Sequence, residues 1–65
     1  MSWETVQNDW QRHVGHVRVT WGRITDDELQ QINGQRDALL KKIQEKYHIT
    51  EPEADEQVRT FEKRM

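Results

Sequence analysis

The chain has 65 residues, of which 32% are hydrophobic and 34% charged, with a formal net charge of −2 and no cysteine. This length allows a single domain over residues 1–65 with a small core, and the lack of cysteine excludes disulfides and thiolate metal sites. No apolar run approaches the ~20 residues of a membrane span, so we expect a cytoplasmic protein that does not enter membranes.

The first segment predicts one long helix. Apolar residues recur there every three or four positions: Trp3, Val6, Trp10, Val14, Val17 and Trp21. At 100° per residue they lie within an arc of roughly 80°, which is typical of a helix face buried along its length. We expect Ser2 to cap the start of this helix and Gly22 to end it in a left-handed conformation. Val19 points away from the stripe, either as a lone exposed side chain or as a contact for a partner.

The acids at residues 26–28 mark the start of a second helix, over about residues 26–33. Thr25 and Glu28 have the spacing of a capping box, in which each side chain bonds the backbone of the other. The other two acids lie where the positive end of a helix favours carboxylates. Three adjacent side chains on a first turn also point in different directions, which is poor geometry for one cation. We therefore predict a helix start here, and not a metal or catalytic site.

The same pattern recurs at Thr50 and Glu53, which predicts a second capping box. It separates a third helix, over about residues 35–47, from a fourth, over about residues 51–63. His48 follows the third helix, and we expect it to end that helix at a positive φ. The apolar positions of these two helices are Leu39, Leu40, Ile43, Tyr47, Ala54, Val58 and Phe61.

These patterns predict an all-α fold of four short helices, arranged as two αα-hairpins packed across each other. The very short link at Gly34 argues against a regular up-down bundle. We expect a monomer. The predicted core consists of Trp10, Val14, Val17, Leu29, Ile32, Leu40, Ile43, Val58 and Phe61.

Few residues are typical of a chemical site. His13 and His16, with Asp9 one turn earlier, have a spacing that metal ions use, but on an exposed helix they would need a further shell of ligands. Ser2 is the only serine and is assigned to a helix cap, and the three glycines are too dispersed for a phosphate loop. We predict no catalytic, cofactor-binding or metal-binding residue, and no cofactor.

Several stretches of the chain form a distinctive set. They are Trp10, Gly15, Trp21-Gly22, Thr25-Asp26-Asp27, Gly34 with Arg36 and Asp37, and Ile43-Gln44 to Tyr47. Together they resemble the CsbD-like family of small bacterial stress-response proteins, over nearly the whole chain. The resemblance implies a compact four-helix domain of two crossed hairpins, similar to the SAM-domain-like arrangement. Family members often carry Gly where this chain has Lys41 and His48, and Lys where it has His16.

The resemblance implies an abundant, hydrophilic protein of the general stress response, with no catalytic residue to carry over. We therefore predict a non-enzymatic protein that acts by binding or protection, with an unknown partner. The alternative is a nucleic-acid-associated helical module, because small helical folds often serve that role. We expect no specific nucleic-acid binding, since on the third helix only Lys42 and Lys46 form a short basic strip.

Overall fold

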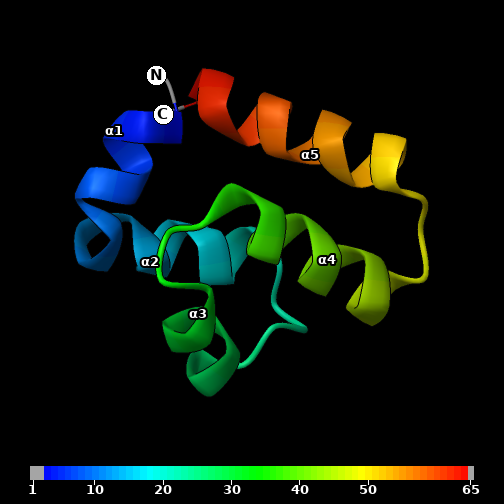
Figure 1. Cartoon of the computed structure of the whole chain (residues 1–65), viewed down its shortest axis with the longest axis horizontal. Helices are drawn as coiled ribbons and strands as arrows, with labels where there is room; N and C mark the ends of the chain where they lie inside the picture. Colours follow the sequence, from blue (N-terminus) through cyan, green and yellow to red (C-terminus); the bar gives the residue numbers. More distant parts are fainter. Residues whose placement is uncertain (1–2, 65) are drawn as a thin grey trace.

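The computed structural model describes residues 3–64, and all of its regular structure is helical. The helices are α1 (Trp3–Asn8), α2 (Trp10–Thr20), α3 (Asp26–Ile32), α4 (Arg36–Tyr47) and α5 (Glu51–Arg64). No strand occurs within this range, so the predicted all-α class is confirmed. Figure 1 shows α5 lying antiparallel over α4, with α1 beside the end of α5 and α3 on the opposite side of the molecule.

The prediction of one long first helix is wrong, because the helix breaks at Asp9. Asp9 has φ −128° and ψ 47°, which is not helical, and α2 begins at the next residue. The break brings the rings of Trp3 and Trp10 to 6.2 Å between centroids. In a straight helix, residues seven apart are separated by about 10.5 Å along the axis. The bend thus lets both indoles pack into one core.

The break also means that the four-helix arrangement of two crossed hairpins is not confirmed, since the described chain contains five helices. The predicted cap at Ser2 lies outside the described residues. The other three predicted helices appear with bounds close to the expected ones.

The core contains eight of the nine residues predicted for it. Val14 is the exception: it is only half-buried, and its neighbour His13 is buried with 8% of its surface exposed. The buried apolar side chains are Trp3, Val6, Trp10, Val17, Trp21, Ile24, Leu29, Ile32, Leu39, Leu40, Ile43, Ala54, Val58 and Phe61. All three tryptophans are therefore core residues.

Two helices end in left-handed residues, of which His48 was predicted. Asn33 follows α3 with φ 47°, and Gly34 comes next with φ 81°. His48 follows α4 with φ 54°, and its backbone N–H donates to the carbonyl of Gln44. Each of these residues turns the chain sharply so that the next helix folds back onto the core.

The prediction for Gly22 is wrong, because α2 ends without a left-handed residue. Its last cap is Trp21, with φ −121° and ψ 73°. The Trp21 N–H donates to the Val17 carbonyl at 2.8 Å, and the Ile24 N–H donates to the Trp21 carbonyl at 3.1 Å. This turn buries the Trp21 and Ile24 side chains directly and needs no positive φ.

The short helix α1 is attached to distant parts of the chain. The indole of Trp3 donates to the carbonyl of Gly34 at 2.8 Å, and its ring lies 6.5 Å from that of Phe61. A Cβ atom on Gly34 would lie 3.2 Å from the Cα and carbonyl oxygen of Gln7. Glycine at this position therefore permits both the positive φ and the close approach of α1.

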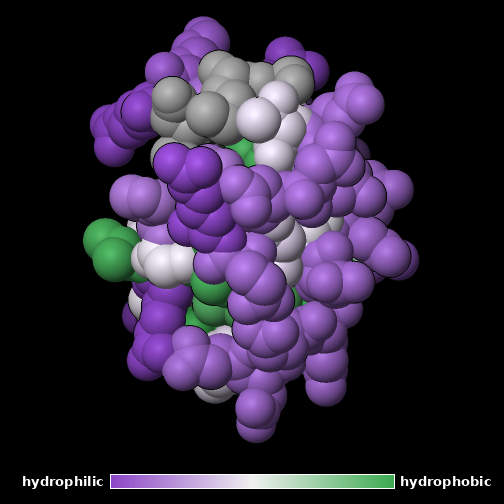
Figure 2. All heavy atoms as spheres, turned by 90° about the vertical axis from the view of Figure 1, so that its left-hand side faces the viewer, coloured by the Kyte–Doolittle hydropathy of each residue, from purple (hydrophilic) through white to green (hydrophobic). Residues whose placement is uncertain are grey.

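The surface is strongly polar. Figure 2 shows one face on which hydrophilic side chains predominate and hydrophobic ones are visible only in small areas. Val19 points into solvent as predicted and is the only large hydrophobic side chain among residues 3–64 that is exposed, at 85%. No described helix is long and apolar enough to span a bilayer.

Candidate functional site

The structure does not bring the histidine pair of α2 into a ligand set. His13 is buried, and its Nδ1 has no hydrogen-bond partner, whereas His16 is exposed. The carboxylate of Asp9 lies 3.7 Å from the guanidinium of Arg12. Across the described part of the chain, no group of three or more histidine and acidic side chains is arranged to hold a metal ion.

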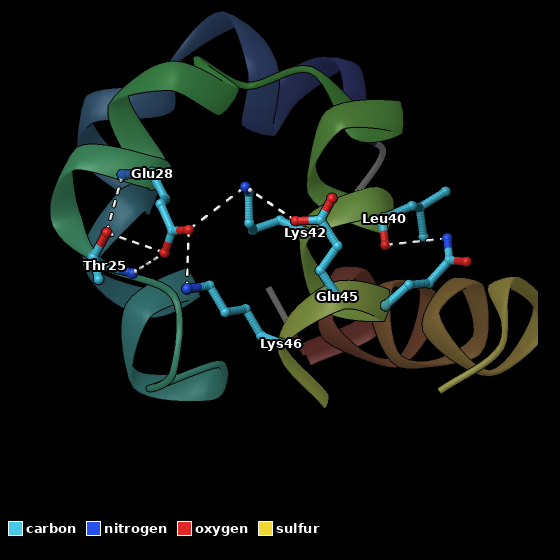
Figure 3. Close-up of polar contacts among 7 residues, drawn as sticks. Thr25, Glu28, Leu40, Lys42, Glu45 and Lys46 are labelled. Atoms are coloured by element: carbon cyan, nitrogen blue, oxygen red, sulfur yellow. Dashed lines mark hydrogen bonds and ion pairs between the residues drawn. The ribbon is translucent and has the colours of Figure 1, made fainter. Parts of the chain in front are cut away.

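The acids at the start of α3 form the predicted capping box. The backbone N–H of Glu28 donates to Thr25 Oγ1 at 3.2 Å, and the backbone N–H of Thr25 donates to Glu28 Oε1 at 3.0 Å. The second carboxylate oxygen of Glu28 faces α4, where it lies 3.0 Å from Lys46 Nζ and 3.5 Å from Lys42 Nζ (Figure 3). Both oxygens of this carboxylate are therefore engaged within the fold.

These contacts fix the charge of Glu28. The hydrogen bond from the Thr25 backbone, followed by the contact with Lys46, lowers the pKa of Glu28 from 4.5 to about 2. A general acid or base has to exchange its proton near the working pH. Glu28 is ionised well below neutral pH, so its role is to cap α3 and hold it against α4.

The sequence predicted the capping box but not the lysines that complete it. Lys42 and Lys46 are four residues apart and so share one face of α4. They are the same basic strip that sequence analysis considered for phosphate binding. Their spacing showed that the two lysines share a helix face. Only the packing of α3 on α4 shows that Glu28 lies against them.

A second polar cluster joins α4 to α5. Arg36 Nη2 lies 2.7 Å from Asp55 Oδ1, and Arg36 Nε lies 3.3 Å from Glu62 Oε1. All three side chains are partly buried, and the hydrogen bond from Arg36 lowers the pKa of Asp55. Arg36 lies on the apolar side of its helix, so these two carboxylates are what allow it to pack there.

One hollow of the surface is an open groove of about 590 Å³. It lies between α5 and the C-terminal ends of α2 and α4. One wall is a face of α5 that carries Glu53, Glu56, Gln57, Thr60, Phe61 and Arg64. Thr20, Trp21 and Tyr47 form the other side.

The floor of the groove is aromatic and fixed by contacts. Trp21 and Phe61 are both buried, with ring centroids 5.3 Å apart. The Trp21 indole donates to Gln57 Oε1 at 2.9 Å, which joins the two walls. The hydroxyl of Tyr47 accepts from the backbone N–H of Arg23 at 3.1 Å, and the Arg23 guanidinium lies 5.4 Å from the centre of the Tyr47 ring.

The rim of the groove has charges of both signs. Glu53 Oε1 accepts hydrogen bonds from the Thr50 hydroxyl at 2.8 Å and from the Thr50 backbone N–H at 3.2 Å, and these bonds lower the pKa of Glu53. Within residues 3–64, neither Glu53 nor Glu56 forms an ion pair with Lys or Arg. Arg64 lies three turns further along the same helix face. The groove therefore has an acidic end and a basic end.

Sequence analysis missed this groove. Its α5 residues do recur at helical spacing, but so do those of any helix face. The hollow is lined by residues from the ends of α2 and α4 and from α5, which are far apart in the sequence, so it is a property of tertiary packing. No single stretch of sequence contains it.

Comparison with known proteins places these features in a family context. A sequence model of the CsbD-like family matches residues 4–56. The UPF0337 protein NE2439 of Nitrosomonas europaea is 48% identical over 61 residues, which cover 94% of this chain and 65% of that relative. The UPF0337 protein YjbJ of Escherichia coli O6:H1 is 38% identical over 64 residues, covering 98% of this chain and 93% of the relative. The UPF0337 protein PA4738 of Pseudomonas aeruginosa is 32% identical over 65 residues and the full length of both chains. No solved structure matches this chain.

Proposed function

Because this chain belongs to the CsbD-like family, we propose that it is a non-enzymatic bacterial stress-response protein that acts by binding or protecting other molecules. We further propose that residues 1–65 form one domain, which works as a monomer in the cytoplasm. The observation that supports a binding role is the groove beside α5, which has a fixed aromatic floor and charged ends. The clustered charges elsewhere hold helices together: Glu28 joins α3 to α4, and Arg36 joins α4 to α5.

The test is the survival of bacteria that lack the gene. We expect a deletion strain to survive osmotic, heat or desiccation stress less well than its parent, and a plasmid copy of the gene to restore survival. A copy with Gln31→Ala, which changes an exposed side chain of α3, serves as the matched control and should restore survival equally. Equal survival of deletion and parent strains under all three stresses would contradict the proposal.

The partner can be sought in the same cells. A tagged copy isolated from stressed and unstressed cultures should retain a specific set of molecules only after stress. Chemical turnover of a co-purified molecule by the isolated protein would contradict the non-enzymatic assignment.

The alternative, a nucleic-acid-associated module, has less support from the charge arrangement. Lys42 and Lys46 lie against Glu28, and Arg36 is held by Asp55 and Glu62. Phosphate binding requires basic side chains that release counterions from the nucleic acid, and it weakens steeply with salt. We expect any retention on heparin or DNA at low salt to be lost at about 0.15 M salt. Retention that persists at this salt concentration, or a footprint on a defined DNA site, would favour the alternative.

A further inference from the structure

The groove beside α5 can be compared with the surroundings of Glu28, where lysines of the same chain lie against the carboxylate. At the first capping box, one oxygen of Glu28 caps α3 and the other lies against the ammonium groups of Lys42 and Lys46 (Figure 3). At the start of α5, one oxygen of Glu53 accepts hydrogen bonds from the backbone N–H and the hydroxyl of Thr50. Glu53 lines the groove. No lysine or arginine of the described chain lies within ion-pair distance of the Glu53 carboxylate.

Glu53 therefore has no counterpart, among the described residues, of the two lysines that lie against Glu28. Glu56 follows Glu53 by three residues and lines the same groove, so the two carboxylates are neighbours on one face of α5. Two adjacent anions beside an aromatic floor are complementary to a cation with an apolar stem. Tyr47 already attracts one cation, because the guanidinium of Arg23 lies 5.4 Å from the centre of its ring.

We propose that this groove binds a small aliphatic amine, with its primary ammonium at Glu53 and Glu56 and its stem beside the half-buried ring of Tyr47. The volume of about 590 Å³ lies in the range of small-molecule sites. Arg64 lines the far end and repels a second ammonium there, which favours a monoamine over a diamine. The inference deepens the proposed binding function by naming a ligand class.

The three indole N–H groups allow a direct test by NMR, because each has a different acceptor. Trp3 donates to the Gly34 carbonyl, Trp10 to the Leu29 carbonyl and Trp21 to Gln57 at the groove floor. Hexylamine titrated into the intact ¹⁵N-labelled protein should shift the Trp21 indole resonance saturably and leave the other two in place. Hexanoate has the same stem with the opposite charge and should cause no such shift.

A pair of double variants separates the two carboxylates of the groove from general charge effects. Glu53→Gln with Glu56→Gln should weaken hexylamine binding about tenfold, since two exposed ion pairs with the ammonium are lost. Glutamine at position 53 still fits a capping box, so α5 keeps its start. Glu4→Gln with Glu51→Gln changes the net charge equally at two exposed positions outside this groove and should bind hexylamine like the unchanged protein.

Three results would overturn the inference: no saturable shift of the Trp21 indole, an equal shift with hexanoate, or an equal loss of binding in both double variants. The Trp3 and Trp10 resonances show in the same spectra that each variant is folded. The titration does not depend on a stress phenotype. A failed survival experiment and a failed titration therefore remain separate results.

Discussion

His48 ends α4 with φ 54°, a conformation that costs most side chains about 1–2 kcal/mol. Asn33 does the same after α3 with φ 47°. Asparagine and histidine enter this region more readily than other residues with a Cβ atom, whereas glycine enters it without strain. The turn after α4 therefore contains local strain that the packing of α5 on α4 offsets.

Replacing His48 by glycine should leave the fold intact and raise its stability by up to about 1 kcal/mol, because the strain is removed. His48→Val is the contrasting change, since a β-branched residue fits this conformation poorly. Urea unfolding followed by circular dichroism measures both. A marked loss of stability in His48→Gly would show that the imidazole contributes more than its backbone position does.

Glu28 gives the protein a specific dependence on acid. Its pKa is about 2 in the folded protein, against an ordinary value of 4.5. Between these values the unfolded chain binds more protons than the folded protein, so stability falls as the pH is lowered through this window. Above pH 4.5 the contribution of Glu28 is fully present.

Glu28→Gln should therefore lower stability at neutral pH and make the loss of stability between pH 4.5 and 2 less steep. The capping geometry remains, because glutamine can replace glutamate in the box. Glu45→Gln removes the other carboxylate that lies against Lys42, where the side chain of Glu45 is 66% exposed, and should change stability little. Urea unfolding at several pH values tests this, and unchanged pH dependence in Glu28→Gln would contradict the assignment.

At the scale of helices, the attachment of α1 depends on one glycine. Gly34 combines φ 81° with a close approach to Gln7, whose backbone would lie only 3.2 Å from a Cβ atom, and its carbonyl accepts the Trp3 indole N–H. Gly15 offers the opposite case, since a Cβ atom there would meet nothing within 4 Å in the middle of α2. The two glycines thus have different physical reasons to be glycine.

Gly34→Ala should destabilise the protein by about 2 kcal/mol or more, through strain at positive φ and displacement of α1. Gly15→Ala should stabilise it by about 0.5–1 kcal/mol, because alanine favours the helix interior. Thermal unfolding of both variants compares them directly. Equal effects of the two changes would contradict the close approach of α1 to Gly34.

The sequence predicted helices best where their ends are set by local chemistry. Thr25 with Glu28, and the left-handed residues Asn33 and His48, act within a few positions of the chain, so the ends they set were predicted. The break at Asp9 was not, because apolar residues keep their three- and four-residue spacing across it. That break is favoured by contacts of Trp3 with residues far along the chain, which periodicity does not contain.

At the scale of the whole molecule, one core connects all five helices. The described part of the chain has a Cα radius of gyration of 10.5 Å, close to the roughly 11 Å expected for a compact chain of this length. Phe61 contacts two of the tryptophans in this core, with its ring centroid 5.3 Å from that of Trp21 and 6.5 Å from that of Trp3. The groove and both charge clusters are built on this core, and they were not predictable because each requires helices distant in sequence.

Phe61→Ala should lower the free energy of unfolding by about 3–5 kcal/mol. The side chain is only 5% exposed, so its removal leaves a cavity in the core. A domain of this size has a stability of similar magnitude, so the variant should be largely unfolded at 37 °C. Val19→Ala changes an exposed side chain and should stay within about 0.5 kcal/mol of the unchanged protein. Circular dichroism against temperature distinguishes them, and similar melting curves would contradict this core.

The contacts of Trp3 also bear on the order in which the protein folds. They join residues 31 and 58 positions apart, so they form only after the intervening chain is already compact. By contrast, α4 and α5 are neighbours along the chain and pack on each other directly. We expect α1, which buries only Trp3 and Val6, to dock last and detach first. Its amide hydrogens should then exchange with deuterated solvent before those of α5, so that the molecule opens from one end while the α4–α5 pair stays closed.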